Sequence, residues 1–326
     1  MKVPISLIID DPAPIISVYR EHADSPFTLD GRELVPTYPN SMLFDFCDVV
    51  ERHGVKGKFS VVPMPGNKGD IINGIEGASR EELDRWLDTV KARIAPRFSI
   101  CPEMLTHHKA VDLETMMPLE MNEKIWSMSQ DRTTLTPYIA KALSMLREVG
   151  FETFGVTSPW YFGLAIEDEY VVSISDAVYN VTGKSDAWYF LRSLTDRENA
   201  KPWIAYNENG RCVVSIPATT DDCIWQTIDT VESSDEYVSR VADEWITADG
   251  SKGEIIRVLD GGGYPILITH WQSLMSNGLG TGIRILDEVC RRVNANLSDR
   301  VEWMSFEEIL DIVLADKAAF PKPSLN

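Results

Sequence analysis

The chain opens with Val3–Ile9, which reads VPISLII, and this run is followed directly by Asp10, Asp11 and Pro12. Seven mostly apolar residues, rich in β-branched side chains, predict a strand that is buried on both faces. Two adjacent carboxylates cannot both point into such a core, because an unpaired buried charge is too costly. In an α/β protein the carboxyl ends of parallel strands form the edge where chemistry takes place, and neighbouring strand residues face opposite ways. We therefore expect Asp10 and Asp11 at this edge in different roles, with a strand-ending Asp-Asp-Pro turn as the alternative interpretation.

Strands alternate with helices along most of the remaining sequence, judged by apolar periodicity and capping signals. Ser-x-x-Glu capping boxes at Ser79 and Ser305 mark helix starts, and Gly54 and Gly150 mark helix ends. Repeated βα units without a linker-like tract favour a barrel formed by residues 1–326 as a single domain. An open doubly wound sheet is the alternative, but no G-x-G-x-x-G or Walker motif supports nucleotide binding. The expected strands are 58–62, 98–105, 151–156, 187–191, 212–216, 265–269 and 301–304; the expected helices are 40–53, 80–94, 135–149, 170–179, 283–293 and one after 305; the segments 25–39 and 66–77 are expected rim loops.

Charge limits the classes of partner. The 326 residues carry 31 basic and 50 acidic side chains, which gives a formal net charge of -19. Such a field repels phosphate backbones and anionic lipid, so we expect neither nucleic acid nor a membrane surface as a partner. Neutral or cationic ligands, or a metal cation, fit this charge better.

Cysteine usage and hydropathy bear on the compartment. The five cysteines are scattered through the chain and form no C-x-x-C motif, which indicates a reducing compartment rather than a disulfide framework or a thiolate zinc site. No apolar stretch of about 18 residues is present, and the first strand begins without a signal-peptide pattern. We therefore predict a cytoplasmic protein.

Imidazole and carboxylate side chains gather directly after predicted strands. In a barrel these positions converge on one rim, and together they form a ligand set that suits Zn²⁺ or a similar divalent ion. Each residue alone also fits an ordinary loop or core position, and we expect His22 and His53 to be surface residues. The residues that follow strands are Asp10, Asp11, His107, His108, Asp221, Asp222 and His270.

Five short motifs, in order along nearly the whole chain, resemble those of the polysaccharide deacetylase family. The family's Thr-Phe-Asp-Asp-Gly, Gly-x-Lys-Ala-Thr-Phe-Phe-Val, Glu-Ile-Gly-x-His, Arg-x-Pro-Tyr/Trp and Leu-x-His motifs are matched by residues 8–12, 54–61, 103–107, 157–160 and 268–270. The resemblance implies an irregular (β/α)7 barrel. It also implies a hydrolase that removes an acyl group from an N-acylated or O-acylated carbohydrate with the help of a metal, expected to be zinc.

The resemblance also implies roles for individual residues. Asp10 would be the general base, Asp11 and His107 metal ligands, and His270 the general acid that protonates the leaving amine. The cation and a backbone N–H near Trp160 would stabilise the oxyanion. A histidine and a carboxylate can perform this proton transfer near neutral pH.

Two motif positions depart from the family pattern. The second ligand histidine of the family corresponds to Val111, so we expect His108, or Asp112 four residues after it, to complete the metal site. The family arginine that orients the base corresponds to Thr157. These differences predict a metal site that is altered, built from other ligands or absent.

Aromatic residues near the rim motifs complete the predicted site. They could stack on sugar rings, although tryptophan is also a frequent core residue. Two alternatives belong to other functional classes: a metal-independent glycosidase that uses Asp11 and Glu103, and a carbohydrate-binding barrel without activity. The expected substrate-binding residues are Pro159, Trp160, Asp222, Trp225 and Trp271.

Overall fold

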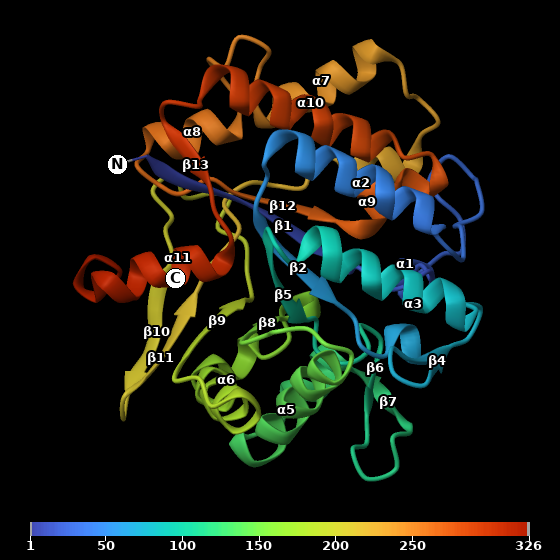
Figure 1. Cartoon of the computed structure of the whole chain (residues 1–326), viewed down its shortest axis with the longest axis vertical. Coiled ribbons are helices and arrows are strands. Elements are labelled where there is room, and N and C mark those ends of the chain that lie inside the picture. The colour runs from blue at the N-terminus through green and yellow to red at the C-terminus, as the bar shows by residue number, and fades with distance from the viewer. Residues whose placement is uncertain (1, 325–326) are drawn as a thin grey trace.

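A parallel sheet forms the centre of the computed structural model, which describes residues 2–324 (Figure 1). Its strand order is β12-β1-β2-β5, and β13 pairs with the amino-terminal part of β1. The predicted first strand is confirmed, and every residue of it after Val3 is buried. The strands are β1 (Val3–Asp10), β2 (Gly57–Val61), β5 (Phe98–Pro102), β12 (Ile266–His270) and β13 (Val301–Trp303).

A second sheet continues beyond β5 in the order β8-β9-β11-β10, with only β10 antiparallel to its neighbour. The two sheets meet at a parallel bridge between Glu103 and Thr157, and at a 2.9 Å hydrogen bond from the Thr219 N–H to the Ile266 carbonyl. The closed (β/α)7 barrel is not confirmed, because the strand pairing is interrupted at both junctions. The strands of the second sheet are β8 (Gly155–Thr157), β9 (Asp186–Phe190), β10 (Trp203–Glu208) and β11 (Arg211–Ser215).

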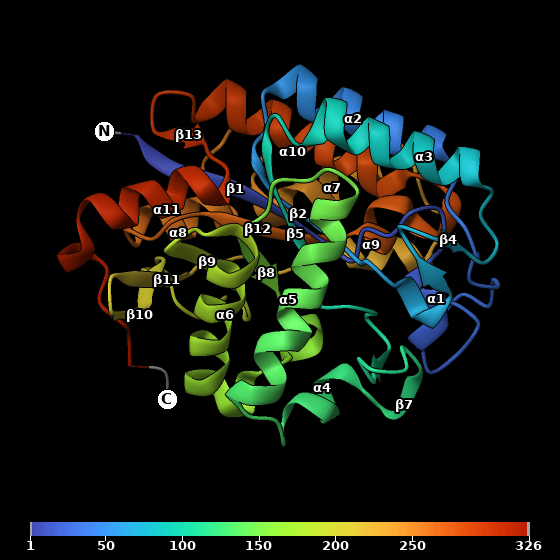
Figure 2. The same cartoon turned by 60° about the horizontal axis from the view of Figure 1, so that its bottom comes forward.

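Helices cover the outside of both sheets. In Figures 1 and 2, α2, α3, α7 and α10 lie on one side of the central sheet, and α5 and α6 lie side by side, with α5 next to β5 and α6 next to the second sheet. Sequence signals placed several of these helices well: α2 has the predicted bounds and ends at Gly54 in a left-handed conformation. The capping boxes at Ser79 and Ser305 are both formed. The helices are α1 (Val18–His22), α2 (Asn40–His53), α3 (Arg80–Thr89), α4 (Glu123–Ser127), α5 (Arg132–Glu148), α6 (Glu167–Thr182), α7 (Asp235–Trp245), α8 (Glu254–Asp260), α9 (Trp271–Met275), α10 (Thr281–Asn296) and α11 (Phe306–Ala315).

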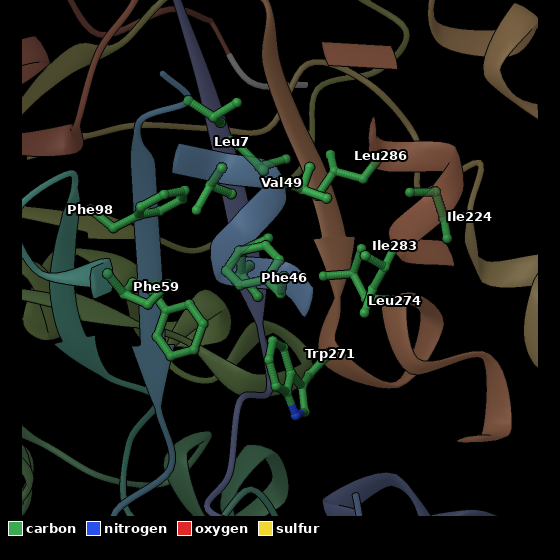
Figure 3. Close-up of a cluster of buried hydrophobic side chains, with 14 of the residues drawn as sticks. Leu7, Phe46, Val49, Phe59, Phe98, Ile224, Trp271, Leu274, Ile283 and Leu286 are labelled. Atoms are coloured by element: carbon green, nitrogen blue, oxygen red, sulfur yellow. The ribbon is translucent and has the colours of Figure 1, made fainter. Parts of the chain in front are cut away.

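The largest apolar core lies between the central sheet and helices α2 and α10 (Figure 3). Leu7 of β1 belongs to it and is fully buried. The ring of Trp271 also lies in this core, with its centroid 5.7 Å from those of Phe46 and Phe59. The prediction that Trp271 contacts substrate is therefore corrected. Its side chain points away from the strand ends into the apolar layer, where a large ring buries the most surface.

Two short hairpins extend the loops beyond the strand ends. They are β3 (Gly69–Asp70) with β4 (Gly74–Ile75), and β6 (Lys109–Val111) with β7 (Pro118–Asn122). The first lies within the expected rim loop 66–77. Within residues 2–324, no helix is both long enough and apolar enough to cross a membrane.

Candidate active site

The predicted edge of the sheet holds a cavity of about 250 Å³. Asp10 ends β1 and is paired in register with His270, which ends β12, so the parallel ladder brings these two sequence-distant residues together. Glu103 follows β5, and His107 lies four residues further along the same loop. All four side chains line the cavity together with Asp11. The convergence of strand ends that the sequence predicted is therefore present.

Asp11, Glu103 and His107 form a compact buried group. His107 Nε2 lies 2.8 Å from Asp11 Oδ1 and 3.4 Å from Glu103 Oε1. One ligand atom from each residue lies within 4.8 Å of the others. The side chains are at most 4% exposed, so this group is a shielded centre rather than a surface cluster.

Each carboxylate in this group has one oxygen committed to the protein. Glu103 Oε2 accepts hydrogen bonds from the Asp11 N–H at 2.7 Å and from Ser60 Oγ at 2.6 Å. Asp11 Oδ2 accepts one from Gln272 Nε2 at 2.6 Å. The other oxygens, Asp11 Oδ1 and Glu103 Oε1, face His107 Nε2. Two oxygens and one nitrogen thus converge, and the second oxygen of each carboxylate fixes its orientation.

The buried charges shift one another's pKa. Burial opposes ionisation of Asp11, but the adjacent His107 and His270 hold the pKa of Asp11 well below its usual value. Burial, with Asp11 and Asp10 nearby, raises the pKa of Glu103 well above its usual value. Burial alone would lower the pKa of His107, but Asp11 and Glu103 raise it to about 9. The group therefore favours ionisation of Asp11 and opposes deprotonation of Glu103 and His107.

This donor set fits a divalent cation. Carboxylate oxygen and imidazole nitrogen are ordinary ligands of Zn²⁺, and catalytic zinc sites commonly use three protein ligands. A cation would take the place of the protons on Glu103 and His107 and would balance the two carboxylates. Asp11, Glu103 and His107 are therefore the residues that could hold it.

The third member of the group differs from the sequence prediction. His108 does not join the group: its Nδ1 lies 3.0 Å from Asn67 Oδ1. Asp112 caps the following turn by accepting the Thr115 N–H at 2.8 Å. The physical reason is local, because His107 has a left-handed backbone (φ 48°) and neighbouring side chains then diverge. The third donor in this structure is Glu103, which the sequence singled out only as a glycosidase carboxylate.

A buried glutamate holds the loop that carries His107. Glu123, at the start of α4, accepts the N–H groups of Leu105, Thr106 and His107 at 2.8 to 3.1 Å. Tyr138 Oη also donates to Glu123, at 2.7 Å. Sequence reasoning missed Glu123, since nothing in its local pattern distinguishes it from an ordinary helix-start acid.

Asp10 is paired with a buried lysine. Lys58 of β2 is fully buried and forms an ion pair with Asp10 Oδ1. Its Nζ also donates to Thr157 Oγ1 at 2.8 Å and lies 5.0 Å from the centre of the Phe190 ring. Asp10 raises the pKa of Lys58 although burial alone would lower it. The charged group beside Asp10 is therefore Lys58, although Thr157 occupies the position where an arginine was expected. A lysine within an apolar strand was a sequence signal that could have predicted this ion pair.

His270, which also lines the cavity, is paired with Asp222. Asp222 Oδ2 lies 2.8 Å from His270 Nδ1 and also accepts from Ser273 Oγ at 2.9 Å. Burial alone would lower the pKa of His270, but Asp222 and Asp11 raise it to about 10. Asp222 does not line the cavity and lies behind His270, so the structure places it next to the imidazole rather than in contact with a ligand.

Two of the predicted aromatic residues line the cavity. Trp160 and Trp225 line it, whereas Pro159 is buried outside its lining. Trp160 has a left-handed backbone (φ 45°), and its ring centroid lies 4.2 Å from that of His107. Both tryptophans also line an outer groove of about 940 Å³, together with Tyr19 and Phe27. The cavity therefore opens into a larger aromatic-rimmed groove.

His22, expected on the surface, lines both the cavity and the outer groove. Its ring centroid lies 4.9 Å from that of His107 and 4.6 Å from that of Trp160. Burial and the neighbouring His107 lower the pKa of His22 to about 3, which keeps its imidazole neutral. No strand precedes His22, so the strand-end signal that identified the other histidines was absent.

Two solved structures resemble the fold of this chain over most of its length. One is a protein provisionally described as a polysaccharide deacetylase from Mycobacterium smegmatis. The TM-score is 0.53, the sequence identity is 13%, and the match covers 87% of this chain and 80% of that chain. The other is provisionally described as a glycoside hydrolase/deacetylase from Parabacteroides distasonis. The TM-score is 0.53, the sequence identity is 10%, and the match covers 95% of this chain and 71% of that chain. The chain shares their fold. With so few identical residues, the likeness concerns the fold and not the reaction.

Sequence comparison adds no family to this likeness. No protein-family model matches the chain, and no curated protein matches its sequence. The site must therefore be interpreted from its own residues.

Proposed function

We propose that this protein is a hydrolase that removes an acyl group from an N-acylated or O-acylated carbohydrate with the help of a divalent metal ion. One observation carries the proposal: the convergent group Asp11, Glu103 and His107 lines the same cavity as the carboxylate of Asp10 and the imidazole of His270. Hydrolysis of an amide or ester needs a base, an acid and stabilisation of the oxyanion, and this set can supply all three. The shared fold of the two deacetylase-type structures supports the same reaction.

Asp10 and His270 divide the proton transfers. Asp10, paired with Lys58, accepts a proton from the attacking water, and the lysine holds the carboxylate in place. His270, charged through its bond to Asp222, donates a proton to the departing amine or alcohol. A divalent cation held by Asp11, Glu103 and His107 would supply Lewis-acid stabilisation of the negative charge on the carbonyl oxygen.

Trp160 and Trp225 are proposed to bind the sugar ring. Their rings line the cavity and continue into the outer groove, and aromatic faces pack well on the apolar faces of sugars. The negative charge of the chain favours a neutral substrate over an anionic polymer. We propose zinc as the metal because its ordinary ligands match the donor set.

Release of the acyl group is the direct test. The purified chain, loaded with Zn²⁺, would be incubated with a panel of N-acetylated and O-acetylated sugars and oligosaccharides, and acetate and new reducing ends would be measured in parallel. Acetate release that a chelator abolishes and that Zn²⁺ restores supports the proposal. New reducing ends without acetate would replace it with a glycosidase, and affinity for sugars with neither product would indicate a binding protein.

A further inference from the structure

Two nitrogen atoms beside the cavity are buried without a hydrogen-bond partner. They are Nδ1 of His107 and Nε2 of His22. The two rings are in contact, with centroids 4.9 Å apart and planes inclined by 33°. A buried polar group without a partner loses the hydrogen bonds that water would give it, so two such atoms on touching rings require a common explanation.

The protonation of His107 follows from its other nitrogen. Nε2 faces Asp11 and Glu103, so a cation in this group binds Nε2 and leaves the ring proton on Nδ1. Histidines that bind metals almost always donate this second N–H to an acceptor, which fixes the ring and increases its basicity. Among the described residues, Nδ1 has no acceptor at hydrogen-bond distance, and the adjacent imidazole of His22 carries the unused nitrogen.

The surroundings hold His22 against His107. The ring of Trp160 packs on both imidazoles, with centroid distances of 4.2 Å to His107 and 4.6 Å to His22. His22 ends α1, whose first turn is capped by Ser17, and Glu21 next to it forms an ion pair with Lys68 at 3.5 Å. The capped helix and the packing of Trp160 therefore keep the two imidazoles in contact.

We propose that His22 is a positioning residue for the metal centre: its Nε2 accepts the Nδ1–H of His107, directly or through one water, and so orients His107 toward the cation. This inference rests on the metal site of the proposed function. It assigns to His22 a role that acts through His107 and needs no contact with the substrate.

Metal affinity of full-length variants tests this role. His22→Phe keeps a ring against Trp160 but removes the acceptor, and His22→Gln restores an acceptor at a similar distance from the backbone. His108→Phe is the matched control, because His108 is adjacent to His107 in sequence but contacts Asn67. Zn²⁺ affinity would be measured by competition with a chromophoric chelator, and thermal unfolding of the metal-free proteins would show that each variant is folded.

We expect His22→Phe to weaken Zn²⁺ binding by about 10- to 100-fold, which is the usual effect of losing the partner of a metal-bound histidine. His22→Gln should recover most of this loss, and His108→Phe should bind like the wild type. Long-range ¹H–¹⁵N NMR spectra of the Zn²⁺-loaded wild type should show His107 protonated on Nδ1.

Several results would overturn the inference. They are unchanged Zn²⁺ affinity in His22→Phe, equal losses in His22→Phe and His108→Phe, no recovery in His22→Gln, or no Zn²⁺ binding by the wild type. Acetate release is measured separately, so the two proposals fail independently. Activity with an unchanged affinity in His22→Phe removes only the role of His22, whereas the expected loss of affinity without hydrolysis of any acyl sugar removes only the proposed reaction.

Discussion

The two ends of strand β1 lie in the same sheet but are stabilised in different ways. Around Leu7 the strand is surrounded by apolar side chains: Leu7 packs into the layer below α2 and α10 (Figure 3), and Ile8 packs into a second apolar cluster on the other face. At Asp10 and Asp11 the strand is just as buried, yet it is surrounded by Lys58, His107 and Glu103. Apolar burial tolerates loss of one partner by leaving a cavity, whereas a buried charge without its partner has no alternative source of stabilisation.

The largest expected effect is on the rate of the proposed reaction. Replacing Asp10 by Asn removes the proton acceptor, and loss of a general base typically lowers the rate about 10²- to 10⁴-fold. We expect this loss in kcat for acetate release, at a temperature where circular dichroism shows the variant folded. Because Asp10 is buried against Lys58, the substitution should also lower stability. Full activity of Asp10→Asn on an acyl sugar would exclude Asp10 as the base.

The next largest effect is expected on stability, when the ion pair between Lys58 and Asp10 is broken. Lys58→Met leaves Asp10 buried without its cation, and breaking a buried pair in this way costs about 3–5 kcal/mol in the free energy of unfolding. Denaturant unfolding of the single variant and of the double variant Asp10→Asn with Lys58→Met would separate charge from packing. The double variant should be the more stable of the two, since it removes both charges. A single variant within about 1 kcal/mol of the wild type would show that the pair is not important for stability.

The apolar end of the strand provides the contrasting case. Leu7→Ala should lower the free energy of unfolding by about 2–5 kcal/mol, because the core closes only partly around the missing methyl groups. Its Zn²⁺ affinity should equal that of the wild type, since Leu7 lies in the apolar core and not among the residues that line the cavity. Calorimetric titration with Zn²⁺ would check this, and a tenfold weaker affinity would contradict the separation of the two ends.

The smallest expected effect depends on pH. Asp222 contributes to raising the pKa of His270 to about 10, above its usual value of 6.5, so the pair stabilises the folded state fully below pH 6.5 and loses this contribution as pH rises through about 10. Asp222→Asn should therefore be less stable than the wild type by about 1.5–3 kcal/mol at pH 6, with the gap closing toward pH 10. Unfolding curves between these pH values measure the gap, and a gap that stays constant would show that the pair does not carry a linked charge.

Local sequence signals predicted much of the fold. The bounds of α2 follow from its apolar spacing and from Gly54, and the Ser79 and Ser305 boxes placed two further helix starts. Strand β10 was missed because, apart from Trp203, its residues are partly or fully exposed and show no buried run. The hairpin of β6 and β7 was missed because β6 is only three residues long and most of β7 is exposed, so neither strand shows a buried apolar run.

The sequence by itself determined which residues could meet at the strand ends, because burial of β1 forces its terminal carboxylates to the edge of the sheet and parallel strands end at the same edge. Asp10, Asp11, His107 and His270 were therefore identifiable without coordinates. Only the tertiary structure decided that Glu103, and not His108, joins Asp11 and His107 in the candidate metal site. It also decided that Lys58 pairs with Asp10, that His22 contacts His107 and that Trp271 is buried. These choices depend on loop conformations such as the left-handed His107 and on contacts between residues dozens of positions apart, which no local periodicity encodes.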